Sequence, residues 1–141
     1  MELYFIDSSK MELTTYSYEH FDVIIKDFGY EKEKNVDLHN YFDWANIRHW
    51  SFVYEPYSEL ELSKLFSKTI VVRESMNFLI RLKYNMPLIQ VNSSYLKDML
   101  SNLCFETGMG WEAISVCGKY IIEFTDGYEY LAKSNFKIRP T

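Results

Sequence analysis

The last third of the chain contains three short β-prone segments separated by two turn pairs, and this pattern constrains the fold most. The segments are residues 111–117, 120–125 and 128–133, and the turn pairs are Gly118-Lys119 and Asp126-Gly127. Glycine in the first position favours a type II′ turn and Asp-Gly favours a type I′ turn, and both types join antiparallel strands. The sequence therefore predicts a three-stranded antiparallel meander.

Two-residue turns also set the register of the meander. They pair Cys117 with Tyr120 and Thr125 with Tyr128. The middle strand is then apolar on both faces except for Glu123, which lies between Ile114 and Tyr130. A carboxylate in such surroundings needs a partner or a raised pKa. We interpret Glu123 as part of a salt bridge or of the sheet rim, with a catalytic carboxylate as the alternative.

Earlier segments supply helices and further strands. Apolar spacing and capping residues predict helices over residues 17–28, 58–67 and 93–106, with Ser17, Ser58 and Ser93 as N-caps. Gly29 fits the left-handed position that ends a helix. Strands are expected at residues 2–7, 11–16, 49–55 and 88–91. Residues 69–84 can be either strands or a helix. The β-branched run Thr69–Val72 and the alternation after Met76 favour strands, but no Gly or Pro marks a turn near Ser75, so a helix stays the alternative.

These elements predict an α+β fold, a mostly antiparallel sheet packed with two or three helices. The 141 residues are 48% hydrophobic, 18% aromatic and 25% charged, which fits a single globular domain over residues 1–141. The N-terminus has no signal-peptide pattern, and no apolar run is long enough to span a membrane. We therefore expect a cytoplasmic protein, in which Cys104 and Cys117 are reduced core thiols.

Acidic residues are concentrated in the first half of the chain. Residues 1–70 hold 13 acidic and 7 basic side chains, whereas residues 71–141 hold 7 and 8. The net charge of −5 argues against nucleic-acid binding, which needs a surplus of Lys and Arg. Two interpretations stay open for the first half: a solvated face, or an acidic surface that meets a basic partner.

Catalytic and metal-binding motifs are not recognisable in the sequence. Gly108-Met109-Gly110 fits no phosphate-binding loop, and His20, His39 and His49 match no metal-ligand spacing. Carboxylate pairs such as Glu55 with Glu59, or Glu112 with Glu123, depend on the tertiary arrangement. We therefore predict no enzyme activity, no cofactor and no metal.

In size, charge and layout the chain resembles the small immunity proteins of bacterial contact-dependent growth-inhibition and polymorphic toxin systems. The resemblance covers the acidic, aromatic stretch Tyr16–Glu61 and the terminal segments WEAISVCG, YIIEFTDG and YEYLAKSNF. It implies a protein that binds one cognate basic toxin, often a nuclease, one to one, and covers its active site. The implied contact residues are carboxylates with aromatic anchors: Glu19, Asp22, Asp27, Glu31, Asp37, Asp43, Trp44 and Trp50.

Other functions remain open beside this one. A small enzyme, a ligand-binding domain with an aromatic-lined pocket, and a regulatory module are each compatible with the 25 aromatic residues. A phage anti-defence protein that acts as an acidic decoy is compatible with the charge, although −5 over 141 residues is far below the charge density of DNA.

Overall fold

The computed structural model describes residues 10–35, 40–48, 51–53, 59–82, 85–98, 110–125 and 131–138. Within these ranges the strands form a seven-stranded sheet in the order β1-β4-β3-β5-β6-β7-β2, and every pairing is antiparallel. The elements are β1 (Met11–Leu13), α1 (His20–Asp27), the 3-10 turn η2 (Trp44–Asn46), β2 (Ser51–Val53), α2 (Glu59–Ser67), α3 (Ile70–Arg73), β3 (Asn77–Arg81), β4 (Ile89–Asn92), α4 (Ser93–Leu96), β5 (Gly110–Ser115), β6 (Ile121–Thr125) and β7 (Leu131–Ser134). The predicted α+β class with a C-terminal meander is confirmed.

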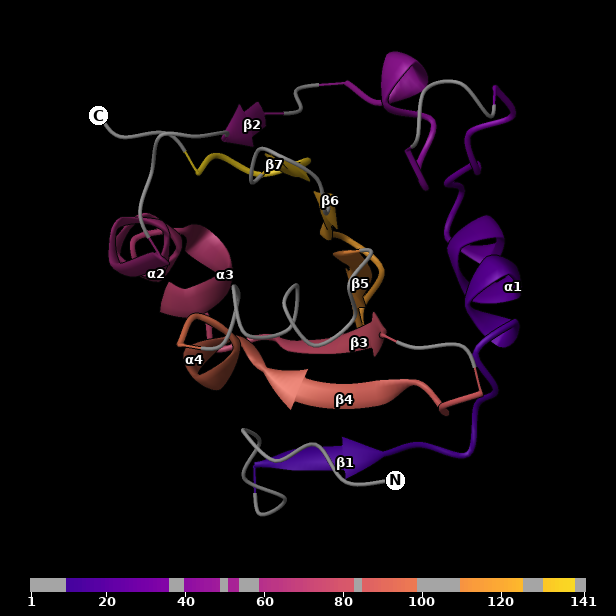
Figure 1. Cartoon of the computed structure of the whole chain (residues 1–141), viewed down its shortest axis with the longest axis horizontal. Helices are drawn as coiled ribbons and strands as arrows, with labels where there is room; N and C mark the ends of the chain where they lie inside the picture. The colour runs from indigo at the N-terminus through magenta and orange to yellow at the C-terminus, as the bar shows by residue number, and fades with distance from the viewer. Residues whose placement is uncertain are drawn as a thin grey trace.

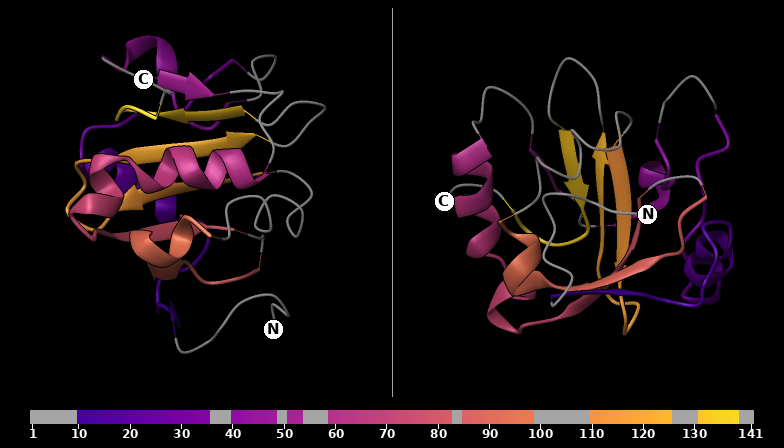
Figure 2. Two further views of the ribbon diagram at one scale, coloured as in Figure 1. Left: turned by 90° about the vertical axis from the view of Figure 1, so that its left-hand side faces the viewer. Right: turned by 60° about the horizontal axis from the view of Figure 1, so that its bottom comes forward.

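The sheet is bent, and its two faces are covered by different parts of the chain. Helices α2, α3 and α4 lie within the bend, whereas α1 lies on the opposite side (Figure 1). The two views of Figure 2 show the same arrangement. We call the surface toward α2–α4 the inner face and the surface toward α1 the outer face.

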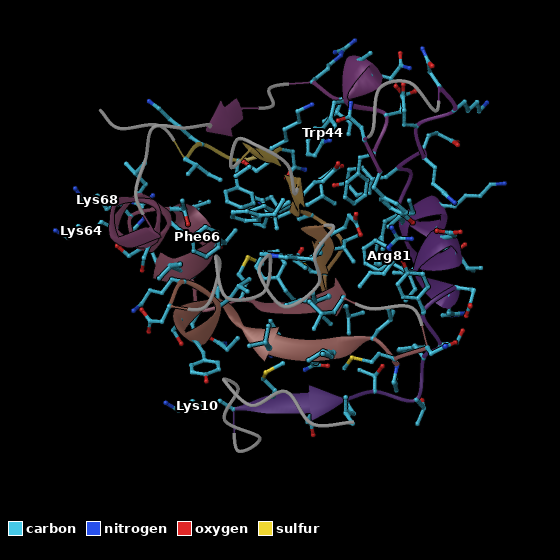
Figure 3. All side chains as sticks on the ribbon, in the orientation of Figure 1. Lys10, Trp44, Lys64, Phe66, Lys68 and Arg81 are labelled. Atoms are coloured by element: carbon cyan, nitrogen blue, oxygen red, sulfur yellow. The ribbon has the colours of Figure 1, made fainter. Side chains whose placement is uncertain are left out.

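Apolar side chains fill the inner face. Phe66 from α2, Val71 from α3 and Leu96 from α4 belong to one buried cluster with the sheet residues. The sheet contributes Phe78, Ile80, Val91, Trp111, Ala113, Ile122 and Phe124. In Figure 3 Phe66 points from α2 toward the sheet, while Lys64 and Lys68 of the same helix point away from it. Burial of aromatic and aliphatic area of this kind is the main source of folding free energy.

Helix α1 lies on the outer face and ends as the sequence predicts. Phe21 and Ile25 are buried against the sheet. Gly29 has φ +91°, its N–H donates to Lys26, and the N–H of Tyr30 donates to Ile25, which is the Schellman pattern. The predicted start is wrong, because α1 begins at His20 and no side chain caps it. The N–H of His20 instead donates to the carbonyl of Ser17.

Residues 69–82 contain a helical turn followed by a strand. The β-branched run, whose composition favoured a strand and for which a helix was the alternative, forms the N-cap and first three residues of α3, and its Val71 is buried in the inner cluster. Ser75 takes φ +51° and ends this turn without glycine. The side-chain amide of Asn92 donates to the carbonyl of Ser75 at 3.1 Å, and the Ser75 hydroxyl contacts Asn92 Oδ1 at 3.2 Å. A contact from a distant strand therefore stabilises a turn that the local sequence does not mark.

Other predicted elements are confirmed in part. Strands lie within the predicted ranges 11–16 and 49–55, β4 overlaps the predicted range 88–91 with a shift of one residue, and α2 lies within 58–67. Only the first turn of the predicted helix 93–106 is described, and its N-cap is Asn92 rather than Ser93. The predicted strand 2–7, the N-cap Ser58 and residues 99–106 lie outside the described residues.

The register of the meander corrects the prediction. Ile114 pairs with Ile121, and the N–H of Ser115 donates to Tyr120, so four residues rather than two form the first turn. This change keeps every side chain on its predicted face. Thr125 pairs with Leu131 instead of Tyr128. The second change turns β7 over, because side chains alternate between the faces along a strand.

Candidate functional site

The corrected register places four charged residues in one row across the outer face. Arg81 of β3 pairs with Glu112 of β5, Glu112 pairs with Glu123 of β6, and Glu123 pairs with Lys133 of β7. We call these four residues the charge row. When all four side chains are ionised, their signs run plus, minus, minus, plus and the net charge of the row is zero. Glu123 thus lies between Glu112 and Lys133 and not, as predicted, between Ile114 and Tyr130.

Glu123 is the anchor for the segment of residues 40–46, which we call the cover segment. Its side chain accepts hydrogen bonds from the N–H of Tyr41 at 2.9 Å, the N–H of Phe42 at 3.0 Å and the indole of Trp44 at 2.9 Å. Glu123 is 2% exposed. Burial raises the pKa of this carboxyl, and the three hydrogen bonds and Lys133 oppose that shift only in part.

Glu112 and Arg81 form an ion pair within the row. Nε of Arg81 lies 2.8 Å from Oε2 of Glu112, and the two side chains are 18% and 13% exposed. Burial raises the pKa of Glu112 to about 7, and the charges of Glu123 and Asp22 add to this shift while Arg81 opposes it. Glu112 therefore changes its charge near neutral pH.

Aromatic rings enclose the Arg81 guanidinium. It lies 4.7 Å from the ring centre of Tyr18 and 4.1 Å from that of Tyr41, which is the geometry of cation–π contacts. The hydroxyl of Tyr41 donates to Asp22, and Nζ of Lys32 lies 3.0 Å from the other oxygen of Asp22. Burial raises the pKa of Asp22, but Tyr41 and Lys32 lower it by more, so the net shift is downward. Figure 3 shows Arg81 at the end of β3 nearest α1.

The cover segment continues this arrangement toward the surface. Lys32 and Phe42 form an antiparallel bridge, the N–H of Glu33 donates to Tyr41, and the N–H of Asp43 donates to Glu31. Residues 31–33, which follow α1, are therefore fixed to the segment that Glu123 holds. Figure 3 shows Trp44 in this segment above the sheet. Loss of the Glu123 anchor would affect the position of residues 31–33 as well.

The predicted contact residues divide into two groups. Glu19, Asp27 and Glu31 are exposed, and no ion pair within the described ranges involves them. Asp22 is held by Tyr41 and Lys32, and Asp43 accepts a hydrogen bond from Asn46 at 2.6 Å. Trp44 is 2% exposed, so it belongs to the anchor of the cover segment and not to the surface. Asp37 and Trp50 lie outside the described residues.

The exposed residues form a stripe along α1. Glu19, Val23 and Asp27 follow the i, i+4 spacing of one helix face, and Val23 is 49% exposed. Glu31 follows shortly after the end of the helix. We call these four residues the α1 surface. Within this surface, the exposed Val23 has Glu19 one turn before it and Asp27 one turn after it along the helix.

Cys117 differs from its prediction as a core thiol. It is exposed in the turn between β5 and β6. A hydrogen bond with the Ser115 hydroxyl lowers the pKa of its thiol. Cys104 lies outside the described residues. Within the described part of the chain, no three His, Cys, Asp or Glu side chains are grouped to hold a metal ion.

Sequence reasoning identified Glu123 and named the pair Glu112–Glu123, but it missed Arg81, Tyr41 and Lys133. The alternation after Met76 had placed Arg81 on the polar face of a strand, which was the available signal. Lys133 could not be placed beside Glu123 while the second turn was taken as two residues. Nothing in the local sequence indicates that Tyr41, 82 residues before Glu123, donates to it.

Within the described ranges, no helix combines the length and the apolar character that a membrane span requires. Comparisons with protein-family models, with curated proteins and with solved structures found no match to this chain.

Proposed function

We propose that this protein is an inhibitor, of the immunity-protein kind, that binds one basic protein through the α1 surface. The partner is a cognate bacterial toxin with a basic active site, such as a nuclease, and the complex is one to one and cytoplasmic. The observation that carries the proposal is the α1 surface itself, where Glu19 and Asp27 flank the exposed Val23 along the helix, Glu31 follows, and no ion pair within the described ranges involves these carboxylates.

Two physical arguments support this use of the surface. Carboxylates at a rim steer a basic partner toward its site and disfavour acidic partners. An apolar side chain that loses water at the centre of a contact adds affinity. Val23 lies between Glu19 and Asp27 along the helix, so the surface offers both features together. A carboxylate can also take the place of a substrate phosphate in the active site of a nuclease.

The contacts that hold the α1 surface against the rest of the protein favour a rigid binding face. Phe21 and Ile25 fix α1 to the sheet, and the cover segment fixes residues 31–33 through Glu123. A face held in one conformation loses little conformational entropy when it binds, which favours high affinity.

An enzyme that uses the Glu112–Glu123 pair is the second candidate, and the pKa of Glu112 near 7 favours it. The contacts of Glu123 argue against it. Both oxygens of that carboxylate accept hydrogen bonds from the cover segment, so a substrate would have to displace this segment. A recess of about 350 Å³ is lined by residues of β1, β3 and β4 such as Glu12, Asn77 and Gln90, which are polar rather than aromatic.

The test is capture of the partner by the tagged chain, with washes at about 0.15 M and about 1 M salt. We expect one basic protein at a one-to-one ratio, whose nuclease activity is lost on binding. The variant Glu19→Lys/Asp27→Lys should lower the affinity about 100-fold or more. Glu12→Lys/Glu74→Lys makes the same charge change at exposed carboxylates elsewhere and should bind normally. Equal binding by both double variants, or no stoichiometric partner in cells that express the toxin, would contradict the proposal.

A further inference from the structure

We propose that the Glu112–Glu123 pair is a proton-operated clamp for the cover segment. With one proton on the pair the segment is fastened to the sheet, and with both carboxylates ionised it loosens. The clamp is a property of this chain alone. It stands whether or not the α1 surface binds a partner.

The arrangement of the charge row makes the pair sensitive to a proton. Glu112 and Glu123 are directly opposite each other in the register, and like charges in that position repel. Arg81 and Lys133 lie at the two ends of the row, so no cation separates the carboxylates. Both carboxylates are largely shielded from water, which strengthens the repulsion.

The hydrogen bonds decide which carboxylate holds the proton. Three N–H groups donate to Glu123 and favour its ionised form. The Glu112 carboxylate accepts a hydrogen bond from Nε of Arg81, and an oxygen of the neutral carboxyl can still accept this bond. The proton therefore resides on Glu112, while Glu123 keeps the charge that holds the cover segment. Burial raises the pKa of Glu112 to about 7, so Glu112 gains and loses this proton near neutral pH.

The groups that face Glu112 come from β3, α1, the residues before α1, the cover segment and β6, and the first four of these groups keep their protonation states while Glu112 titrates. Arg81 of β3 has a raised pKa, and Asp22 of α1 has a lowered one. Tyr18, before α1, and Tyr41, in the cover segment, have raised pKa values and stay neutral. Glu123 of β6 completes the set, and its own charged neighbour on the other side is Lys133 of β7.

The clamp is tested by amide hydrogen exchange of Tyr41 and Phe42, measured by NMR at pH 6 and pH 8 and corrected for intrinsic rates. We expect their opening constants to be about ten-fold larger at pH 8, which follows when a group with pKa about 7 returns to its ordinary value on opening. The opening constants of Tyr41 and Phe42 should also exceed those of the Ile80 and Ile122 amides in the centre of the sheet. In Glu112→Gln the dependence on pH should disappear, because the pair then carries one charge at every pH tested.

Each alternative result would overturn the clamp. Opening constants that are equal at the two pH values, or no larger than those of Ile80 and Ile122, show that no local clamp operates. A dependence that persists in Glu112→Gln assigns it to other groups. Carboxyl-carbon titration of the unaltered chain gives a second measurement that needs no variant. One carbon of the pair should titrate near pH 7, and titration of both below about pH 5.5 would refute the proposal.

Discussion

The inner and outer faces of one sheet are buried by different chemistry. The inner face packs aromatic and aliphatic side chains from α2, α3 and α4 against the strands. The outer face carries a row of four charges beneath α1 and the cover segment, of which Glu123 is buried and the other three are partly buried, beside an apolar cluster that includes Phe21 and Leu79. The stability gained from apolar packing depends on the buried area and volume. The stability of a buried carboxylate depends on the direction of every hydrogen bond that it accepts. The inner face should therefore be insensitive to pH and the outer face sensitive to it.

Truncation of an inner-face residue should produce the largest loss of stability. Phe78 is fully buried, so Phe78→Ala removes a ring and leaves a cavity that costs about 4 kcal/mol. Denaturant unfolding should give the same loss at pH 6 and at pH 8. A loss that differs between the two pH values would show that the inner face is coupled to the charge row. It would contradict the expected difference in pH sensitivity between the two faces.

Replacement of the anchor carboxylate should be the next largest effect. Glu123→Gln leaves one acceptor oxygen for three donors, so buried N–H groups lose their partner, and we expect a loss of about 3 kcal/mol. Glu112→Gln is the matched control, because its amide oxygen can still accept from Arg81 and the repulsion with Glu123 disappears. At pH 8 this control should lie within about 1 kcal/mol of the unaltered chain. Equal losses in urea unfolding would contradict the assigned roles.

Two glycines test how closely the outer layer fits the sheet. Gly118 has φ +78°, and an added Cβ would lie 2.0 Å from Cδ1 of Phe28, the residue that ends α1. Gly118→Ala should cost about 2 kcal/mol, from the strained φ and from displacement of the ring. Gly29 has φ +91° but nothing within 4 Å, so Gly29→Ala should cost only about 1 kcal/mol. Thermal unfolding of the two variants measures both losses of stability. Equal losses would show that the contact with Phe28 is unimportant.

The smallest expected effect is the pH dependence of the whole fold. The folded pKa of Glu112 is about 7, above its ordinary value of 4.5, so the folded state binds more protons than the unfolded state between these values. Its contribution to stability is present below pH 4.5 and is lost as the pH rises through 7. The free energy of unfolding should fall by about 1 kcal/mol from pH 6 to pH 8. Asp22, with a lowered pKa, acts only at acidic pH, where its contribution is lost as the pH falls.

Glu112→Gln separates this effect from general changes in charge. In that variant the free energy of unfolding should be flat between pH 6 and pH 8 to within a few tenths of a kcal/mol. An unaltered slope would assign the pH dependence to groups other than the pair.

Local sequence patterns were sufficient to predict the elements whose signals span only a few residues. The spacing of Phe21 and Ile25 together with Gly29 identified α1 and its end, and the alternating segments after Gly110 identified the meander. It also singled out Glu123 as a carboxylate that requires a partner. Helix periodicity, helix-ending glycine and strand alternation act over a few residues, so they can be read without the fold.

The features that depend on contacts between distant residues could be recognised only in the tertiary structure. Residues 70–73 are helical although the first three are β-branched, because Val71 is buried in the inner cluster and Asn92 braces the turn at Ser75. The pairing of Thr125 with Leu131 placed Lys133 beside Glu123, and the cover segment supplied the donors from about 80 positions away. A buried carboxylate needs partners arranged in three dimensions, and no local pattern specifies where the chain will find them.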